Sequence, residues 1–172
     1  GSYYLSAGSS SKSFVSKLDS SGNFIWAKEF GGTEHFENYV ESMSLAIDPF
    51  GNIYSAGRFY GLIDFNPGSQ RNNLKSNAGS RRLISYVCKL NPSGEYIWAN
   101  KIDAQNNNWI LSVATDHSGN VYSSGMFIGN TDFDPGADTF SLQSGPCIDI
   151  FILKLDANGN FKWVKQLESP YV

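Results

Sequence analysis

One twelve-residue pattern occurs three times in this chain of 172 residues, and it constrains the fold more than any other feature. Each copy begins with Lys-Leu, continues through Asp/Asn-x-x-Gly and reaches a Trp nine positions after the Lys. The three tryptophans, Trp26, Trp98 and Trp163, are 72 and 65 residues apart. Such a spacing indicates a supersecondary unit that is repeated along the chain.

Two further blocks repeat with an offset of 68 residues. Residues 44–57 return as 112–125, and Asp-Phe-Asn-Pro-Gly at 64–68 returns as Asp-Phe-Asp-Pro-Gly at 132–136. The segments between turn residues are short, β-branched and aromatic, which favours strands over helices. We predict four strands in each unit. In the first complete unit they span about 41–48, 52–59, 84–90 and 95–102.

Five connections share the form Asp/Asn-x-x-Gly-x and begin at Asp19, Asp48, Asn91, Asp116 and Asp156. The first side chain can accept hydrogen bonds from its own turn, and the Gly can adopt a positive φ. We therefore predict a tight hairpin at each of them.

A four-stranded unit of this length, repeated radially, is typical of a β-propeller blade. The composition agrees, because 15% aromatic and only 17% charged residues argue against a helical bundle. No apolar run is long enough for a membrane-spanning helix, so we expect no membrane insertion. The predicted fold class is all-β, a partial propeller of about two and three-quarter four-stranded antiparallel blades. Residues 1–40 would form three strands and an inter-blade loop, 41–108 one complete blade and 109–172 another.

Closure of a propeller needs at least about four blades. We therefore expect both end blades to expose an apolar face that is covered by further blades, by other chains or by a partner protein.

The motifs resemble the bacterial repeats called SBBP (seven-bladed β-propeller) repeats. The resemblance rests on Asp-x-x-Gly-Asn-x-Tyr-x-x-Gly from Asp48 and from Asp116, on the Asp-Phe-Asp/Asn-Pro-Gly block and on the Lys-to-Trp pattern. It implies part of a long secreted or surface-anchored bacterial protein, often from bacteria with type IX secretion, and it brings no catalytic residues. We therefore expect an extracellular or cell-surface location.

The long connections, from strand two to three and from one blade to the next, emerge on one face of a propeller. They contain the candidate ligand-binding residues Tyr60, Arg71, Arg81 and Arg82, together with His35 and Trp109. Exposed aromatic and Arg side chains often anchor protein or glycan partners. We expect a protein partner or the remaining blades, with a glycan as a second class of ligand. Alternatively, these residues only cap the blade ends.

The recurring Trp and Lys residues are better explained by structure than by chemistry. One Trp in each blade at a fixed strand position indicates packing between blades. Lys17, Lys89 and Lys154 recur in the same way, so we predict that each pairs with a carboxylate or carbonyl at a strand end.

Three acids, Asp132, Asp134 and Asp138, could offer oxygen ligands to calcium. We favour a plain turn, because Pro-Gly lies at its centre and the sister block is less acidic. Cys88 and Cys147 have no zinc-site spacing and could be either a disulfide or two free thiols. We expect no metal and no cofactor.

A net charge of −3 gives no general attraction for nucleic acid. The sequence contains no phosphate-binding loop and no nucleophile elbow, so we predict a non-catalytic module for binding or scaffolding. The alternatives are a polysaccharide hydrolase or lyase that uses Asp64, Asp132 or Asp134, and a passive spacer or exported passenger segment held by a partner.

Overall fold

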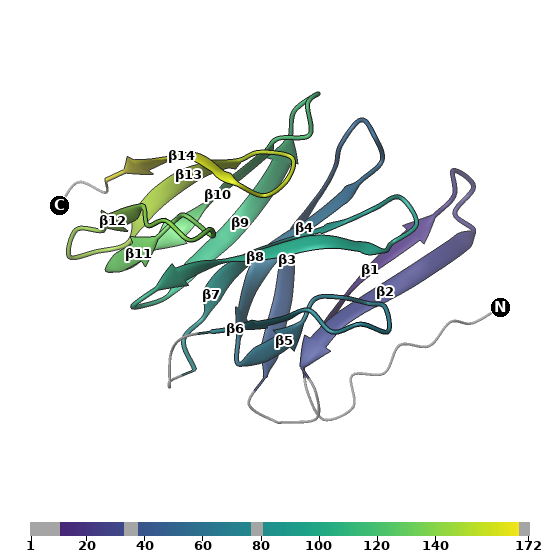
Figure 1. Ribbon diagram of the computed structural model, residues 1–172, viewed down its shortest axis with the longest axis horizontal. Coiled ribbons are helices and arrows are strands. Elements are labelled where there is room, and N and C mark those ends of the chain that lie inside the picture. Colours follow the sequence, from purple (N-terminus) through teal and green to yellow (C-terminus); the bar gives the residue numbers. More distant parts are fainter. Residues whose placement is uncertain (1–10, 33–37, 77–80, 169–172) are drawn as a thin grey trace.

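The computed structural model describes residues 11–32, 38–76 and 81–168. Within these ranges it contains fourteen strands, paired antiparallel, and no helix (Figure 1). In particular, the described residues include no helix that is long and apolar enough to cross a membrane. The all-β prediction is therefore confirmed for this part of the chain.

The strands form three consecutive units, which we name here. The first unit has β1 (Lys12–Leu18) and β2 (Phe24–Gly32). The second is the meander β3 (Tyr39–Ile47), β4 (Ile53–Tyr60), β7 (Ile84–Leu90) and β8 (Tyr96–Ala104). The third is the meander β9 (Asn108–Thr115), β10 (Val121–Phe127), β13 (Asp149–Leu155) and β14 (Phe161–Leu167). The four strands predicted for the first complete unit are confirmed to within about two residues at each end.

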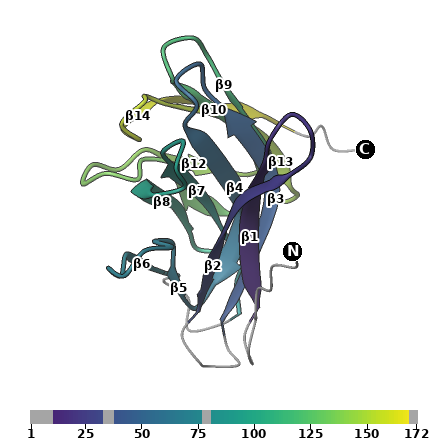
Figure 2. The ribbon, with the colours of Figure 1, turned by 90° about the vertical axis from the view of Figure 1, so that its right-hand side faces the viewer.

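The units lie side by side, from β1 and β2 on the right of Figure 1 to β13 and β14 on the left. Figure 2 looks along this row from the side of the first unit. β9 packs against β3 and β4 of the second unit, and β1 packs against β3. Each described unit therefore contacts its neighbour in the sequence through a face of its sheet.

The five predicted hairpin turns are confirmed. In the turn at Asp48, the carboxylate Oδ1 accepts main-chain N–H bonds from Phe50 and Asn52, both at 2.9 Å. Gly51 has a φ of 81° and donates its N–H to the carbonyl of Asp48. The other four turns repeat these bonds, and their glycines have φ values of 81°, 77°, 76° and 85°.

The two Asp-Phe-Asn/Asp-Pro-Gly blocks lie in small hairpins, so each of these long connections contains two short strands beyond the four predicted for its unit. β5 (Leu62–Asp64) pairs with β6 (Asn73–Lys75), and β11 (Asn130–Asp132) pairs with β12 (Ser141–Gln143). β5 also pairs with β2, and β11 pairs with β8, the outermost strand of the preceding unit in each case. An outer strand leaves main-chain groups unpaired, and each hairpin satisfies some of them.

Each of these blocks also inserts its Phe into the core. Phe65 is fully buried, with its ring centroid 4.5 Å from Tyr86, 5.5 Å from Phe59 and 5.9 Å from Phe30. Phe30 belongs to the first unit, whereas Phe59 and Tyr86 belong to the second. The hairpin therefore joins two units both by main-chain pairing and by aromatic packing. Phe133 is also fully buried one unit later, where its ring packs against Phe127 and Phe151 of the third unit in a core that includes Ile102 of the second unit.

Two hydrophobic cores lie between the units. The core between the first and second units includes Val15, Phe30, Tyr86 and Leu90. The core between the second and third units is built around residues of β4, β7, β10 and β13. β7 lies between the two cores, and all seven of its residues are buried. The fold is therefore held together mainly by packing between units.

Candidate binding surfaces

At the end with the tight turns, the first and second units each form hydrogen bonds to the turn between the third and fourth strands of the next unit. Lys17 Nζ donates to the carbonyl of Pro92 at 2.9 Å, and Lys89 Nζ donates to the carbonyl of Ala157, also at 2.9 Å. Pro92 and Ala157 occupy equivalent positions in their turns. These two recurring lysines therefore pair with a carbonyl, as predicted, but the carbonyl lies in a turn of the next unit rather than at a strand end.

Trp98 lies at the same contact. Its indole Nε1 donates to the carbonyl of Ala157 at 3.2 Å, and Asn100 Nδ2 donates to the carbonyl of Gly159 at 2.7 Å. Gly159 is buried against the indole, because a Cβ at this position would come within 3.1 Å of the Trp98 ring. Trp98 thus contacts the next unit, as predicted for the recurring tryptophans, and Trp26 packs against the preceding core in the same way.

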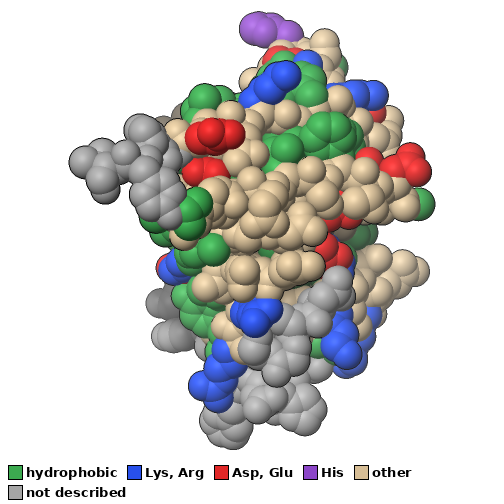
Figure 3. All heavy atoms as spheres, turned by 90° about the vertical axis from the view of Figure 1, so that its left-hand side faces the viewer, with side chains coloured by type: hydrophobic (Ala, Val, Ile, Leu, Met, Phe, Trp, Pro, Cys, Tyr) green, Lys and Arg blue, Asp and Glu red, His purple; other side chains and the backbone are tan. Residues whose placement is uncertain are grey.

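The third unit carries the same side chains on its outer face. Lys154 lies over the ring of Tyr122 at 4.9 Å, as Lys89 lies over Tyr54 at 5.0 Å. Trp163 packs edge-on against Tyr122, as Trp98 packs against Tyr54. Among the described residues no further turn lies against this face, which Figure 3 views directly.

We call the outer face of the third unit the receiving face. It exposes three large apolar side chains, Ile150, Ile152 and Leu167. Their equivalents in the second unit are Ser85, Val87 and Ile102, which the third unit covers completely. For example, Ile152 is 37% exposed, whereas Val87 is 1% exposed.

We call the opposite end, on the first unit, the inserted face. Phe14 is 60% exposed and Leu18 is 54% exposed, although the equivalent residues Tyr86 and Leu90 are fully buried in the second unit. The turn that begins at Asp19 belongs to this face, and its Gly22 is exposed with no atom near the place of a Cβ. The first unit thus exposes strand-three residues whose equivalents the second unit buries, and its described strands include no equivalent of β9, which packs against β3 and β4 in the interior.

The end with the long connections holds Tyr60, one of the predicted ligand-binding residues. The Tyr60 ring stacks on that of Tyr39, with centroids 5.5 Å apart and planes within 10°. Beside them, Arg58 Nε and the Tyr39 hydroxyl donate to Glu41 Oε2 at 2.7 and 2.9 Å. The bond from Arg58 lowers the pKa of Glu41, while burial and the neighbouring carboxylate raise the pKa of Tyr39. We call Tyr39, Glu41, Arg58 and Tyr60 the tyrosine cluster.

Sequence reasoning missed three members of this cluster. The sequence contains part of the signal, because Tyr39 and Glu41 are alternate residues of β3, but their position opposite Tyr60 and Arg58 follows from the β3–β4 register. Alternate residues of paired strands share one face of a sheet.

The structure also brings Arg82 close to the segment that carries Trp109. Arg82 Nη1 donates to the carbonyl of Gln105, and Leu83 N donates to Asn107 Oδ1 at 3.0 Å. The indole Nε1 of Trp109 is buried and has no hydrogen-bond partner within the described ranges. A cleft of about 330 Å³ lies here and is lined by Arg82, Asp103, Ala104, Gln105, Asn130, Asp132 and Ser141.

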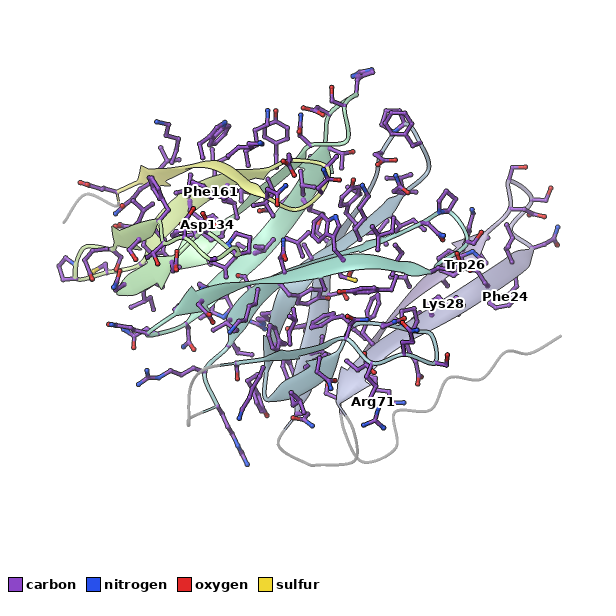
Figure 4. All side chains as sticks on the ribbon, in the orientation of Figure 1. Phe24, Trp26, Lys28, Arg71, Asp134 and Phe161 are labelled. Carbon is purple, nitrogen blue, oxygen red and sulfur yellow. The ribbon has the colours of Figure 1, made fainter. Side chains whose placement is uncertain are left out.

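The remaining predicted residues are more scattered. Arg71 is exposed on the connection between β5 and β6, at the lower edge in Figure 4, and Arg81 is exposed just before β7. His35 lies outside the described residues. Arg82 therefore lies beside the segment that carries Trp109, whereas Tyr60 belongs to the separate tyrosine cluster.

The carboxylates considered for calcium or catalysis close turns. Asp132 Oδ1 accepts N–H bonds from Asp134 and Phe140 at 3.1 and 2.9 Å, and Asp134 Oδ1 accepts one from Gly136. Asp64 holds its turn in the same way. Asp138 is exposed, and the described residues contain no group of three or more His, Cys, Asp or Glu side chains that could hold a metal ion.

A second cleft, of about 320 Å³, lies between the β11–β12 turn and the β13–β14 turn. Asp134 and Phe161 approach it from these two turns (Figure 4). Its other polar lining includes the amides of Asn100, Asn158 and Asn160. The cleft offers hydrogen-bond donors and acceptors beside one aromatic ring.

The two cysteines are free thiols in very different surroundings. Cys88 is buried in the core between the first and second units, and burial strongly raises the pKa of its thiol. Cys147 is exposed. Of the two alternatives left open by the sequence, the structure shows two free thiols rather than a disulfide.

Comparison with known proteins finds a distant relative. No protein-family model matches the chain. Over 160 residues the chain is 26% identical to an uncharacterized WD repeat-containing protein, L264, of Acanthamoeba polyphaga mimivirus. The match covers 88% of this chain and 11% of that protein, so the chain spans only a small part of its relative.

Proposed function

We propose that this chain is a segment of a β-propeller, and that it acts as a non-catalytic module for binding or scaffolding in a larger protein. The main support is that successive units stack through the same contacts, with a Lys and a Trp of one unit against a turn of the next. The WD repeats named in the distant relative also build propeller blades of four strands. The proposed blades span residues 1–40, 41–108 and 109–172, with the first incomplete.

A protein partner is the ligand class that these features support best. Propellers of the WD type commonly present interaction surfaces, and aromatic and Arg side chains dominate the energy of protein interfaces. The tyrosine cluster, Arg82 and Trp109 supply such side chains at the end with the long connections. A glycan is the second class of ligand, with the same residues as its contacts.

We further propose that the chain belongs to a bacterial protein with SBBP-type repeats, which is exported by type IX secretion and lies outside the cell or on its surface. This proposal rests on the resemblance of the repeat motifs. Proteolysis of intact source cells would test it, because a surface protein is cleaved without lysis, whereas protection until lysis would contradict it.

The experiment that tests the binding role places a photo-crosslinking amino acid at Tyr60 or at Trp109. The control position is His117, which is exposed on a tight turn at the opposite end. Mixed with the proteins that the source organism secretes, the Tyr60 and Trp109 variants should give the same discrete adduct, and Arg82→Ala should reduce its yield. Adducts of equal yield from all three positions, or from none, would contradict the proposal and favour a passive spacer.

A hydrolase or lyase would need two carboxyl groups placed across a cleft. Asp64, Asp132 and Asp134 are instead engaged in closing their own turns. Incubation with a panel of polysaccharides, followed by assay of new reducing ends and of unsaturated products, should show neither. Product formation that Asp132→Asn abolishes would overturn the non-catalytic assignment.

A further inference from the structure

The second cleft described above, here called the amide cleft, lies at the boundary between the second and third units. One wall is Asn100 on β8 of the second unit, and the others are the β11–β12 and β13–β14 turns. Its volume of about 320 Å³ is at the lower end of the range found for small-molecule sites. None of its lining residues is Lys, Arg or His.

Hydrogen bonds within the walls hold the amide cleft in shape. Asn100 Nδ2 donates to the carbonyl of Gly159 at 2.7 Å, which ties the second unit to the β13–β14 turn. In that turn, Asp156 Oδ1 accepts the N–H groups of Asn158 and Asn160 at 2.9 and 3.0 Å. The β11–β12 turn is closed by the carboxylate bonds described above. A site whose walls are already ordered loses little conformational entropy when a ligand binds.

Several lining side chains keep hydrogen-bonding groups that no other described residue uses. The exposed side chains of Asn158 and Asp138 form no hydrogen bond within the described ranges, and Asp134 uses only Oδ1 in its turn. The cleft therefore offers both amide donors and carboxylate or carbonyl acceptors. Sugar hydroxyl groups suit this mixture because each of them can donate and accept. An ammonium group would leave the amide donors unused, and a phosphate would meet two carboxylates without a cation.

An aromatic wall completes the lining. Phe161 is half-buried, and its ring centroid lies 5.0 Å from that of Phe140, with the planes at 31°. Phe140 is itself 43% exposed. In Figure 4, Phe161 lies beside Asp134, so the apolar ring and a carboxylate approach the same space. An aromatic ring beside hydrogen-bonding groups can pack against the C–H face of a sugar whose hydroxyl groups bond at its edge.

The equivalent place between the first and second units has a different lining. Lys28, labelled in Figure 4, stands there instead of Asn100. Its stem lies across the turn, because a Cβ on Gly94 would be 3.0 Å from the Cγ and Cε atoms of Lys28. Glu95 also replaces Asn160. Of these two boundaries, only the one between the second and third units combines a short uncharged Asn with a neutral amide in the turn.

A further unit beside the third would not cover the amide cleft. The residues of the second unit at the equivalent turn positions are exposed, although a described unit lies on each side of it (Figure 1): Gly68, Ser69, Gln70, Ser93 and Glu95. The opening of the amide cleft is therefore independent of the receiving face and the inserted face.

We infer that the amide cleft binds one ring of a neutral oligosaccharide. The sugar hydroxyl groups bond to the amide of Asn158 and to the carboxylates of Asp134 and Asp138, and the C–H face of the ring packs on Phe161. Because the cleft is small and open, the dissociation constant should be on the order of 1 mM. This site is separate from the tyrosine cluster and from the cleft at Arg82, so the inference goes beyond the proposed function.

Titration of the isotope-labelled chain, followed by two-dimensional NMR of its N–H groups, tests the inference. The neutral probes are cellotetraose, maltotetraose and N-acetylated chitotetraose, and at least one should shift the signals of Gly159 and Asn160. The signals of Gly94 and Glu95 in the equivalent turn should not move. Trigalacturonic acid should bind far more weakly, because its carboxylates would meet Asp134. Trilysine is the probe for a basic peptide as the alternative ligand.

Matched variants locate the contact. Asn158→Ala should weaken binding about fivefold, as expected for one lost hydrogen bond, whereas Ser93→Ala at the equivalent exposed position should leave it unchanged. Asn100→Lys should abolish binding, because it introduces the residue that lies across the equivalent turn, and an unchanged urea midpoint would show that the variant is folded. Phe161→Ala should weaken binding up to about tenfold.

Three outcomes would overturn the inference: no shift with any of the neutral probes, binding of trilysine or trigalacturonic acid as strong as that of the neutral probes, and equal effects of Asn158→Ala and Ser93→Ala. Crosslinking from Tyr60 and Trp109 should be the same in Asn100→Lys as in the unmodified chain. A failure of the sugar site is therefore distinguishable from a failure of the proposed function.

Discussion

Replacing Phe65 by Ala should strongly destabilise the protein, although this residue belongs to a connection between strands. The ring is fully buried, and its centroid lies within 6 Å of three other aromatic rings. Deleting a buried Phe side chain costs about 3 to 5 kcal/mol of unfolding free energy. Because Phe65 joins two units, relaxation of the cavity should be limited, and we expect about 4 kcal/mol. With a urea dependence of about 2 kcal/mol per M, the unfolding midpoint should fall by about 2 M.

The assay is urea denaturation followed by intrinsic fluorescence, with Phe50→Ala as the matched control. Phe50 is 67% exposed, so its removal should change the unfolding free energy by no more than about 0.5 kcal/mol. Native-state hydrogen exchange should also show faster exchange in β5 and β6 for Phe65→Ala. Equal effects of the two substitutions would refute the assignment of the Asp-Phe-Asn-Pro-Gly block as a link between units.

Three other outcomes follow from the turns and the cysteines. Gly159→Ala should lower the unfolding free energy more than Gly22→Ala in chemical denaturation. Both glycines have a positive φ, which costs an Ala about 1 to 2 kcal/mol, but only Gly159 lies against Trp98. Equal losses of unfolding free energy would argue against the contact with Trp98. A thiol reagent should label Cys147 at once and Cys88 only on unfolding, so two fast-reacting thiols would contradict the burial of β7. Burial raises the pKa of Asp156, but hydrogen bonds, chiefly from Asn160, lower it further, to about 2. A carboxylate whose pKa is lower in the folded than in the unfolded state stabilises the fold above about pH 4, and this stabilisation is lost as the pH falls toward 2. Asp156→Asn should therefore reduce the fall in unfolding free energy over this range.

Much of the fold could be predicted because the repeated motifs have local causes. The turn at Asp48 is determined by five consecutive residues, whose side-chain acceptor and left-handed Gly act without help from the rest of the chain. The strands of each unit either alternate between apolar and polar residues or are mostly apolar over seven to nine residues, and this pattern is also local. Such features appear in the sequence of one unit and are then repeated.

The hairpins β5–β6 and β11–β12 could not be predicted in this way. Their strands have only three residues each, which is too short for any periodic pattern. What orders them is pairing with β2 or β8 and burial of one Phe, and both depend on a neighbouring unit. The candidate ligand-binding residues were harder still, because Tyr39, Glu41 and Arg58 are recognised as partners of Tyr60 only once the β3–β4 register is known.

The burial of a residue in this architecture is determined by the unit beside it as much as by its own. Val87 and Ile152 occupy the same position in successive units, yet one is 1% and the other 37% exposed. All seven residues of β7 are buried because a unit lies on each side, whereas β13 alternates between buried and exposed residues because the described residues place a unit on one side of it only. An apolar residue at such a position therefore marks a contact surface whether or not the contact is occupied, and in the third unit it marks the surface on which the next unit would pack.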